Sequence, residues 1–257
     1  MKLTNLKTED GVTERQLELT VAGNLVPGAV WTPEGARGGR PLILVGHGGG
    51  MHRLAPPVVG TARRYVTSLG YAVLAIDAPM HGARVAPADA ERVGHAERDR
   101  VMRSGGIRGE ALAVTMQRAL AQIPEWQAAL DAAQALEGVG ADGPVGYSGV
   151  SMGAYLGIPF VAAEPRVKAS VFALAGGQGD DHPLIQAARR ITVPLEFAAQ
   201  WDDGTVTRDE SLALFDAFAS REKTLHANPG RHAELPAFER SSWEAFFLRH
   251  FGPRPPL

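Results

Sequence analysis

Residues 144–163 read PVGYSGVSMGAYLGIPFVAA, and this stretch decides how the chain is expected to fold. Its start, 144–148, is a short β-type run, and its end, 152–163, has helical composition. Between them lies Gly149-Val150-Ser151-Met152-Gly153, a G-x-S-x-G pattern at a strand-to-helix turn. Glycine suits both flanking positions because a side chain there would collide with neighbouring backbone. The turn is expected to push the Ser151 hydroxyl out of the sheet. Ser148 is the rival nucleophile, but the residue two places after it is Val150, so it fails the pattern.

The segments on either side repeat this strand-then-helix order. Predicted strands at 41–46, 71–77, 144–148, 167–175, 194–199 and 222–227 alternate with predicted helices at 61–69, 110–123, 125–136, 152–163, 209–220 and 235–251. Pro124 is placed at the first position of the second of two helices. Residues 16–22 and 25–31 form a predicted hairpin around a Gly23-Asn24 turn. This alternation predicts one α/β domain over 1–257, with a doubly wound, mostly parallel sheet.

The composition excludes several classes of protein. The 257 residues are 45% apolar and 21% charged, and can bury a sizeable core. Because 26 basic residues stand against 28 acidic ones, we expect no nucleic-acid or membrane partner. The lack of cysteine removes disulfides, cysteine-ligated zinc and thiol nucleophiles. No apolar run is long enough to span a bilayer and the start carries no signal-peptide pattern, so a cytoplasmic location is expected.

A glycine-rich loop follows the predicted strand 41–46. It reads His47-Gly48-Gly49-Gly50, and backbone amides without side chains can approach a substrate oxygen closely. The amide of Gly49 or Gly50, together with that of Met152 at a helix N-terminus, is expected to form an oxyanion hole. His47 is expected to brace the loop by hydrogen bonds rather than act as a base.

A candidate acid follows the predicted strand 194–199. Asp202 and Asp203 are adjacent there, at the edge where parallel α/β sheets place their ligands. Asp203 is preferred because it stands three residues before Val206, where the next segment starts to pack, and Asp202 remains the alternative.

A candidate general base follows the last predicted strand, 222–227. Pro229 and Gly230 force a loop, and His232 comes next, ahead of the final helix. His226 is the competitor, but it lies within the strand and is expected to point into packing or solvent.

With Ser151, Asp203 and His232 in this order, the chain resembles the α/β-hydrolases, and among them the dienelactone-hydrolase-like and esterase/acyl-peptidase group. The resemblance spans about 14–251 and rests also on the 47–50 loop and on residues 77–82, DAPMHG. It implies structural roles for Asp77, His81 and Gly82 in the pocket wall. Dienelactone hydrolases proper use a cysteine nucleophile, so that activity is not expected here. The absence of a preceding propeller weakens an oligopeptidase interpretation.

The resemblance also implies a mechanism. His232 takes a proton from Ser151, which attacks the acyl carbonyl of a small-molecule substrate, and Asp203 orients the imidazole. Water then hydrolyses the acyl-enzyme. This predicts a serine hydrolase, most simply a carboxylesterase, without metal or cofactor; the oligomeric state is not predicted.

Other functions stay open at this point. A thioesterase or an amidase or peptidase would use the same triad. A cyclase, an epimerase or a binding protein of the same fold is a further alternative. A metal-dependent hydrolase could use His47, His52, Asp77 and His81, but no recognised metal-ligand spacing is present.

Two segments are candidates for covering the site. Residues 83–109 hold six arginines and four acidic residues, which fits either a lid-like insertion that meets an acidic substrate or a solvated helix with i, i+4 pairs. Residues 176–190 are short for a cap, so a small cap is expected. Met51, His52 and Trp201 are candidates for the pocket lining. Residues 252–257 are predicted to be a frayed tail.

Overall fold

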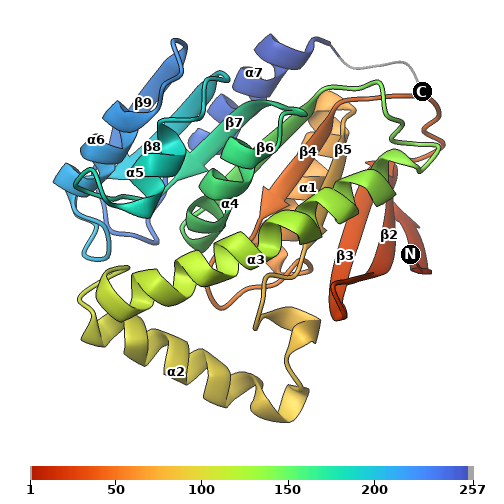
Figure 1. Ribbon diagram of the computed structural model, residues 1–257. Helices are drawn as coiled ribbons and strands as arrows, with labels where there is room; N and C mark the ends of the chain where they lie inside the picture. The colour runs from red at the N-terminus through yellow and green to blue at the C-terminus, as the bar shows by residue number, and fades with distance from the viewer. Residues whose placement is uncertain (1, 254–257) are drawn as a thin grey trace.

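A nine-stranded sheet lies between two layers of helices in the computed structural model, which describes residues 2–253 (Figure 1). The strand order is β1-β2-β3-β5-β4-β6-β7-β8-β9; neighbours from β1 to β5 pair antiparallel, and neighbours from β5 to β9 pair in parallel. The strands are β1 Lys2–Glu9, β2 Val12–Val21, β3 Asn24–Pro33, β4 Leu42–Gly46, β5 Ala72–Ile76, β6 Val145–Val150, β7 Val167–Ala173, β8 Leu195–Gln200 and β9 Lys223–Asn228. The α-helices are α1 Pro56–Arg64, α2 Ala90–Arg103, α3 Gly109–Gln134, α4 Met152–Ala163, α5 Pro183–Ala188, α6 Arg208–Ala217 and α7 Glu239–Phe251.

The apolar core is divided by the sheet into two clusters. One cluster joins the sheet to α3, α4, α5 and α6, and includes Trp126, Tyr147 and Phe160. The other joins it to α1, to the π-helical turn Tyr65–Leu69 that continues α1, and to α7, and includes Phe247. Central strands such as β5 are buried at every residue, which explains their unbroken apolar sequence. The predicted doubly wound α/β fold is confirmed. The segment 176–190, which is expected to form a small cap, contains the short helix α5, and its role as a cap stays a prediction.

The N-terminal strands differ from the prediction in two ways. Val21 pairs with Asn24, so the hairpin turn is Ala22-Gly23 and the predicted Gly23-Asn24 turn is wrong by one residue. Both turn residues have positive φ, 49° and 81°, as a two-residue turn between twisted strands requires. The strand β1 is an addition to the predicted elements, because seven of its eight residues are exposed and no apolar periodicity marks it.

The predicted helix break at Pro124 is also wrong. α3 runs for 26 residues with Pro124 inside it. Proline removes a helical hydrogen bond and crowds the carbonyl four residues earlier, so tertiary contacts must hold the helix together. Glu125 and Trp126 are buried just after the proline, and Glu125 accepts hydrogen bonds of 2.6 and 2.8 Å from Arg84. No helix among residues 2–253 is long and apolar enough to cross a membrane.

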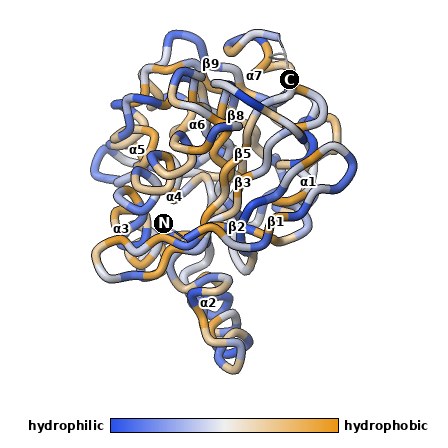
Figure 2. Tube along the Cα trace, turned by 90° about the vertical axis from the view of Figure 1, so that its right-hand side faces the viewer, coloured by the Kyte–Doolittle hydropathy of each residue, from blue (hydrophilic) through white to orange (hydrophobic). Residues whose placement is uncertain are grey.

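The insertion at 83–109 folds mainly into α2, which projects away from the sheet (Figure 2). No residue of α2 is buried. Glu97 ties the helix to α3 through Arg118, with N–O distances of 2.8 and 2.9 Å. Within α2, Glu97 also pairs with Arg100 at 3.0 Å and i, i+3 spacing, so a mixed-sign pair is present on this solvated helix. Whether the segment acts as a lid stays a prediction.

The predicted frayed tail, 252–257, starts at a residue that accepts a hydrogen bond. The Gly252 carbonyl accepts a hydrogen bond from Tyr71, so the chain is fixed at the first residue of the predicted tail, 252–257. Residues 254–257 lie outside the described part of the chain.

Gly157 offers a test of the contact between α4 and the sheet. A Cβ at Gly157 would overlap the ring of Tyr147, which is buried and packed against Trp126, Phe160 and Phe172. We expect Gly157→Ala to lower the free energy of unfolding by about 1–3 kcal/mol in urea titrations, since the ring has no room to move.

Gly60→Ala in α1 is the matched control, because a Cβ there would meet nothing within 4 Å beyond its chain neighbours and its own helix backbone. It is expected to leave stability unchanged or to raise it by up to about 1 kcal/mol. Equal effects of the two variants would contradict the packing argument.

Candidate active site

Ser151 stands at a tight turn between β6 and α4. Its φ of 54° and ψ of −121° are unusual for a residue with a side chain, and its amide donates to the Ala173 carbonyl at 2.8 Å. A Cβ at Gly149 would lie 2.5 Å from the Gly153 carbonyl oxygen, and one at Gly153 would overlap the Gly46 carbonyl. Both glycines of the G-x-S-x-G pattern are therefore required by close backbone approach.

A chain of hydrogen bonds leads from Ser151 to Asp203. Ser151 Oγ lies 2.8 Å from His232 Nε2, and His232 Nδ1 lies 2.6 Å from Asp203 Oδ2. An ionised carboxylate can only accept a hydrogen bond, so the imidazole proton lies on Nδ1 and is donated to Asp203. Nε2 then carries no proton and accepts the hydrogen bond of the Ser151 hydroxyl. The structure thus brings together the three residues chosen from the ends of β6, β8 and β9.

The other oxygen of Asp203 is held by the backbone. Oδ1 accepts from the amides of Thr205 at 2.7 Å and Val206 at 3.1 Å. Burial alone would raise the pKa of Asp203, but the hydrogen bonds from His232 and from these amides outweigh it and lower that pKa. The carboxylate is therefore charged and fixed in direction.

The three rival residues lie elsewhere. Ser148 is buried and receives a long hydrogen bond, 3.4 Å, from Tyr65. Asp202 is exposed and accepts from the Gly230 amide at 3.1 Å, so it supports the loop before His232 rather than contacting the imidazole. His226 faces two glutamates on the side of the sheet that α7 covers.

The glycine loop after β4 forms a turn. Met51 donates to the Gly48 carbonyl at 3.2 Å, and Gly50 between them has a φ of 71°. A turn with positive φ at its third residue requires glycine there, and it leaves the amides of Gly49 and Gly50 outside the turn's own hydrogen bond. Both residues are exposed.

His47 is part of the framework of this loop. Its Nδ1 donates to the Gly48 carbonyl at 2.9 Å, and its Nε2 accepts from the Ala78 amide at 3.0 Å. Burial lowers the pKa of His47 to about 4, so the ring is neutral at physiological pH. Both ring nitrogens are engaged, and none is left for base catalysis.

Asp77 joins the loop after β4 to the loop after β5. It is fully buried, and it accepts from the amides of Arg53 at 2.8 Å and Ala83 at 2.9 Å while pairing with the Arg53 guanidinium. Gly82, with a φ of 56°, passes so close that a Cβ would overlap the carboxylate. Sequence reasoning missed Arg53, because its partner stands 24 residues away in a different loop and no local pattern links the two.

The residues of the alternative metal-dependent hydrolase lie near one another, with the His47 and His81 ring centroids 5.3 Å apart, but their ligand atoms make other hydrogen bonds. His81 Nδ1 lies 3.0 Å from the Pro79 carbonyl, His52 Nδ1 accepts from the Leu54 amide at 3.2 Å, and Asp77 is held as described. Among the described residues, the only group with metal-ligand proximity is Glu196, His226 and Glu239.

The candidate pocket residues are half-buried around the triad loops. Met51 lies beside Gly48, and Trp201 has the Arg208 guanidinium 5.2 Å from its ring centroid. Gly106, at the end of the insertion, passes so close to the Thr205 carbonyl that a Cβ would overlap it. This contact places the insertion beside the Asp203 loop, while the lining role of Met51, His52 and Trp201 stays a prediction.

Solved structures of other proteins share this fold. The chain is 30% identical to a cold-adapted esterase from an Arctic intertidal metagenomic library, solved as a complex with polyethylene glycol, over 98% of this chain and 100% of that one, with a TM-score of 0.79. An acetyl xylan esterase from Paenibacillus sp. R4 is 16% identical, over 97% and 88% of the two chains, with a TM-score of 0.73. A dienelactone hydrolase from Anabaena variabilis is 18% identical, over 94% and 99%, with a TM-score of 0.63. The last two show the fold alone.

No protein-family model and no curated protein sequence matches the chain.

Buried neutral His47 predicts a pH dependence of stability. Its folded pKa of about 4 lies below its ordinary value of 6.5, so between these values the unfolded chain takes up a proton that the folded chain refuses. Stability is therefore expected to fall as pH drops through this window, at up to about 1.4 kcal/mol per pH unit and about 3 kcal/mol in total. Urea unfolding at pH 7, 5.5 and 4.5 measures it.

His47→Asn is expected to be less stable at pH 7 but to show a flatter pH dependence. His95→Gln, which changes an exposed histidine on α2, should follow the wild-type curve. If the His47→Asn curve ran parallel to wild type, the buried ring would not be the source.

Proposed function

Because the chain belongs to the α/β-hydrolases, in the dienelactone-hydrolase-like group that includes esterases, we propose that it is a serine hydrolase that cleaves a carboxylic ester through an acyl-enzyme on Ser151. One observation carries the proposal: the hydrogen-bonded chain from Ser151 through His232 to Asp203, with distances of 2.8 and 2.6 Å. The esterase at 30% identity supports ester hydrolysis as the general class of reaction.

The first half of the reaction forms the acyl-enzyme. His232 Nε2 accepts the hydroxyl proton as Ser151 Oγ forms a bond to the ester carbonyl carbon. The Asp203 carboxylate stabilises the imidazolium that results. The tetrahedral intermediate then collapses, the bond to the alcohol oxygen breaks, and His232 returns the proton to the departing alcohol.

The second half releases the acid. Water takes the place of the alcohol, His232 removes one of its protons, and the oxygen attacks the acyl carbon. Collapse of the second tetrahedral intermediate breaks the bond to Ser151 Oγ, which regains its proton from His232. The enzyme returns to its starting state without a cofactor.

The developing oxyanion is assigned to backbone amides. The Met152 amide lies at the N-terminus of α4, where the helix dipole favours negative charge. The amide of Gly49 or Gly50 supplies the second donor from the loop after β4. A single such donor contributes about 10²–10³ in rate in other hydrolases.

The nucleophile can be tested by covalent labelling. A fluorophosphonate should form an adduct on Ser151 in the wild-type protein, located by peptide mass spectrometry. Ser151→Ala should lose the adduct and lower kcat for a short acyl ester by about 10⁴-fold or more. Ser148→Ala, which removes only the 3.4 Å contact with Tyr65, is the matched control and should still be labelled.

An adduct on Ser148, or full ester hydrolysis by Ser151→Ala, would overturn the assignment. Labelling of Ser151 without hydrolysis of any ester, thioester or amide in a leaving-group series would point instead to a non-hydrolytic acyl-enzyme chemistry such as cyclisation.

The acid can be tested with a pair of neighbouring variants. Asp203→Asn should lower kcat by about 10⁴-fold, because an amide no longer selects the imidazole tautomer with a proton on Nδ1. Asp202→Asn loses an exposed carboxylate and should stay within about tenfold of wild type. A larger loss in Asp202→Asn than in Asp203→Asn would contradict the geometry.

A further inference from the structure

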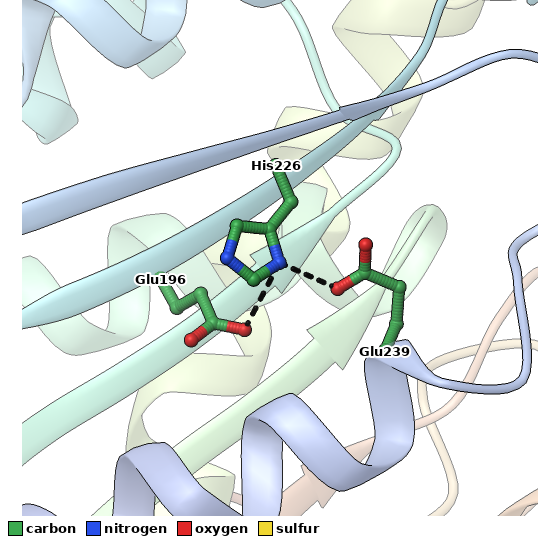
Figure 3. Close-up of side chains that lie close together, drawn as sticks. All are labelled: Glu196, His226 and Glu239. Atoms are coloured by element: carbon green, nitrogen blue, oxygen red, sulfur yellow. Dashed lines mark hydrogen bonds and ion pairs between the residues drawn. The ribbon is translucent and has the colours of Figure 1, made fainter.

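Three side chains converge on the face of the sheet that α7 covers, apart from the triad. Glu196 comes from β8, His226 from β9, and Glu239 from the first residue of α7 (Figure 3). His226 Nδ1 lies 2.8 Å from Glu239 Oε2 and 3.6 Å from Glu196 Oε1. One ligand atom from each residue lies within 4.8 Å of the others.

One proton on His226 Nδ1 cannot form hydrogen bonds to both glutamates. Both carboxylates face the same ring nitrogen, and a proton on that nitrogen is donated to Glu239, the nearer one. Glu196 is only 4% exposed, and its buried Oε1 has no hydrogen-bond partner among the described residues. Burial is the largest influence on the pKa of Glu196 and raises it, while the Ser242 hydrogen bond and His226 act in the opposite direction.

We propose that Glu196, His226 and Glu239 form a binding site for a divalent cation of the zinc type. An ion at their meeting point would be bound by Glu196 Oε1, His226 Nδ1 and Glu239 Oε2, and would give the unpartnered oxygen a partner. Two carboxylates and a neutral imidazole carry a charge of −2, which a divalent ion balances. Nitrogen and oxygen donors of this kind are ordinary ligands of Zn²⁺.

The distances fit this ion after small movements. Zinc bonds of about 2.0–2.2 Å in a tetrahedron place ligand atoms about 3.4 Å apart. The 2.8 Å separation must therefore widen by about half an ångström, the 3.6 Å separation already fits, and the third separation has an upper limit of 4.8 Å.

The surroundings support the ligands and allow entry. Asn228 Nδ2 donates to the second oxygen of Glu239 at 2.7 Å, which orients that carboxylate as outer partners do in metal sites. The His226 side chain is 28% exposed, so the ion can enter from solvent and water can occupy the fourth position.

The bound ion would join three elements near the triad without touching it. β8 leads to Asp203 and β9 leads to His232. At the end of the two strands the Trp201 amide donates to the Asn228 carbonyl at 2.7 Å. Binding to the folded state alone stabilises it, and at a zinc concentration 100 times the Kd it should raise Tm by about 5–10 °C.

The test uses the full-length protein after treatment with a chelator. Zinc chloride is titrated in competition with a chromophoric chelator, and thermal unfolding is followed with and without zinc. The wild type is expected to bind one equivalent tightly and to show the rise in Tm. His226→Gln and Glu196→Gln should each weaken binding by more than about 100-fold, beyond the loss that follows when only an outer partner is removed.

Glu196→Gln also gives a readout that does not depend on affinity. Without metal it should be at least as stable as wild type, because it removes a buried carboxylate whose Oε1 accepts no hydrogen bond. With saturating zinc the order should reverse. This reversal in the order of stability keeps the test decisive even if His226→Gln does not fold.

Two further variants control for zinc bound elsewhere. His95→Gln removes an exposed histidine of α2 that has Glu91 and Asp99 one turn away on either side, and His232→Gln removes the triad imidazole. Both should retain the tight equivalent and the rise in Tm. Absence of a tight equivalent in wild type, or its loss in either control variant rather than in Glu196→Gln, would overturn the site while leaving the proposed hydrolase function untouched.

Discussion

The close approach of backbone between β6, α4 and β4 is the constraint on which the rest of the structure depends. Gly153 packs against the carbonyl of Gly46, and Gly149 against the carbonyl of Gly153, with no room for a Cβ at either position. This contact seats the N-terminus of α4 directly on the end of the sheet. It therefore sets the directions of the Ser151 hydroxyl and of the Met152 amide together. The loops that follow β4, β8 and β9 place the remaining groups of the candidate site around this turn.

Those loops are positioned by buried polar contacts rather than by their apolar packing. Asp77 holds the segments that follow β4 and β5, and neutral His47 links the glycine loop to Ala78. On the other side of Ser151, two backbone amides fix Asp203. Because each of these groups is buried and partnered, the loops behave as extensions of the rigid sheet, which is what a site with hydrogen bonds of 2.6 and 2.8 Å needs.

The parts of this molecule that can be predicted from its sequence are those with local signals. Buried parallel strands such as β4 and β5 are unbroken apolar runs, and the Gly149–Gly153 pattern predicts its own turn. Asp203 and His232 can be identified because they follow strands. The exposed strand β1 has no apolar face and therefore gives no periodic signal. The sequence around Pro124 resembles a helix start. The contacts that hold α3 together beyond it, such as Arg84 with Glu125, join residues 41 positions apart and leave no local signal. The cluster at His226 escapes prediction for the same reason, since its partners come from a different strand and a different helix.

The positive φ of Ser151 has a consequence for the stability of this protein. A residue with a side chain in a sparsely populated backbone region costs about 1–3 kcal/mol, and the surrounding glycine contacts hold Ser151 there regardless. Glycine would occupy the same turn with less strain, so the folded state is not at its most stable sequence. Ser151→Gly would therefore trade the nucleophile for a more stable fold. Activity and stability thus make opposite demands on this one position.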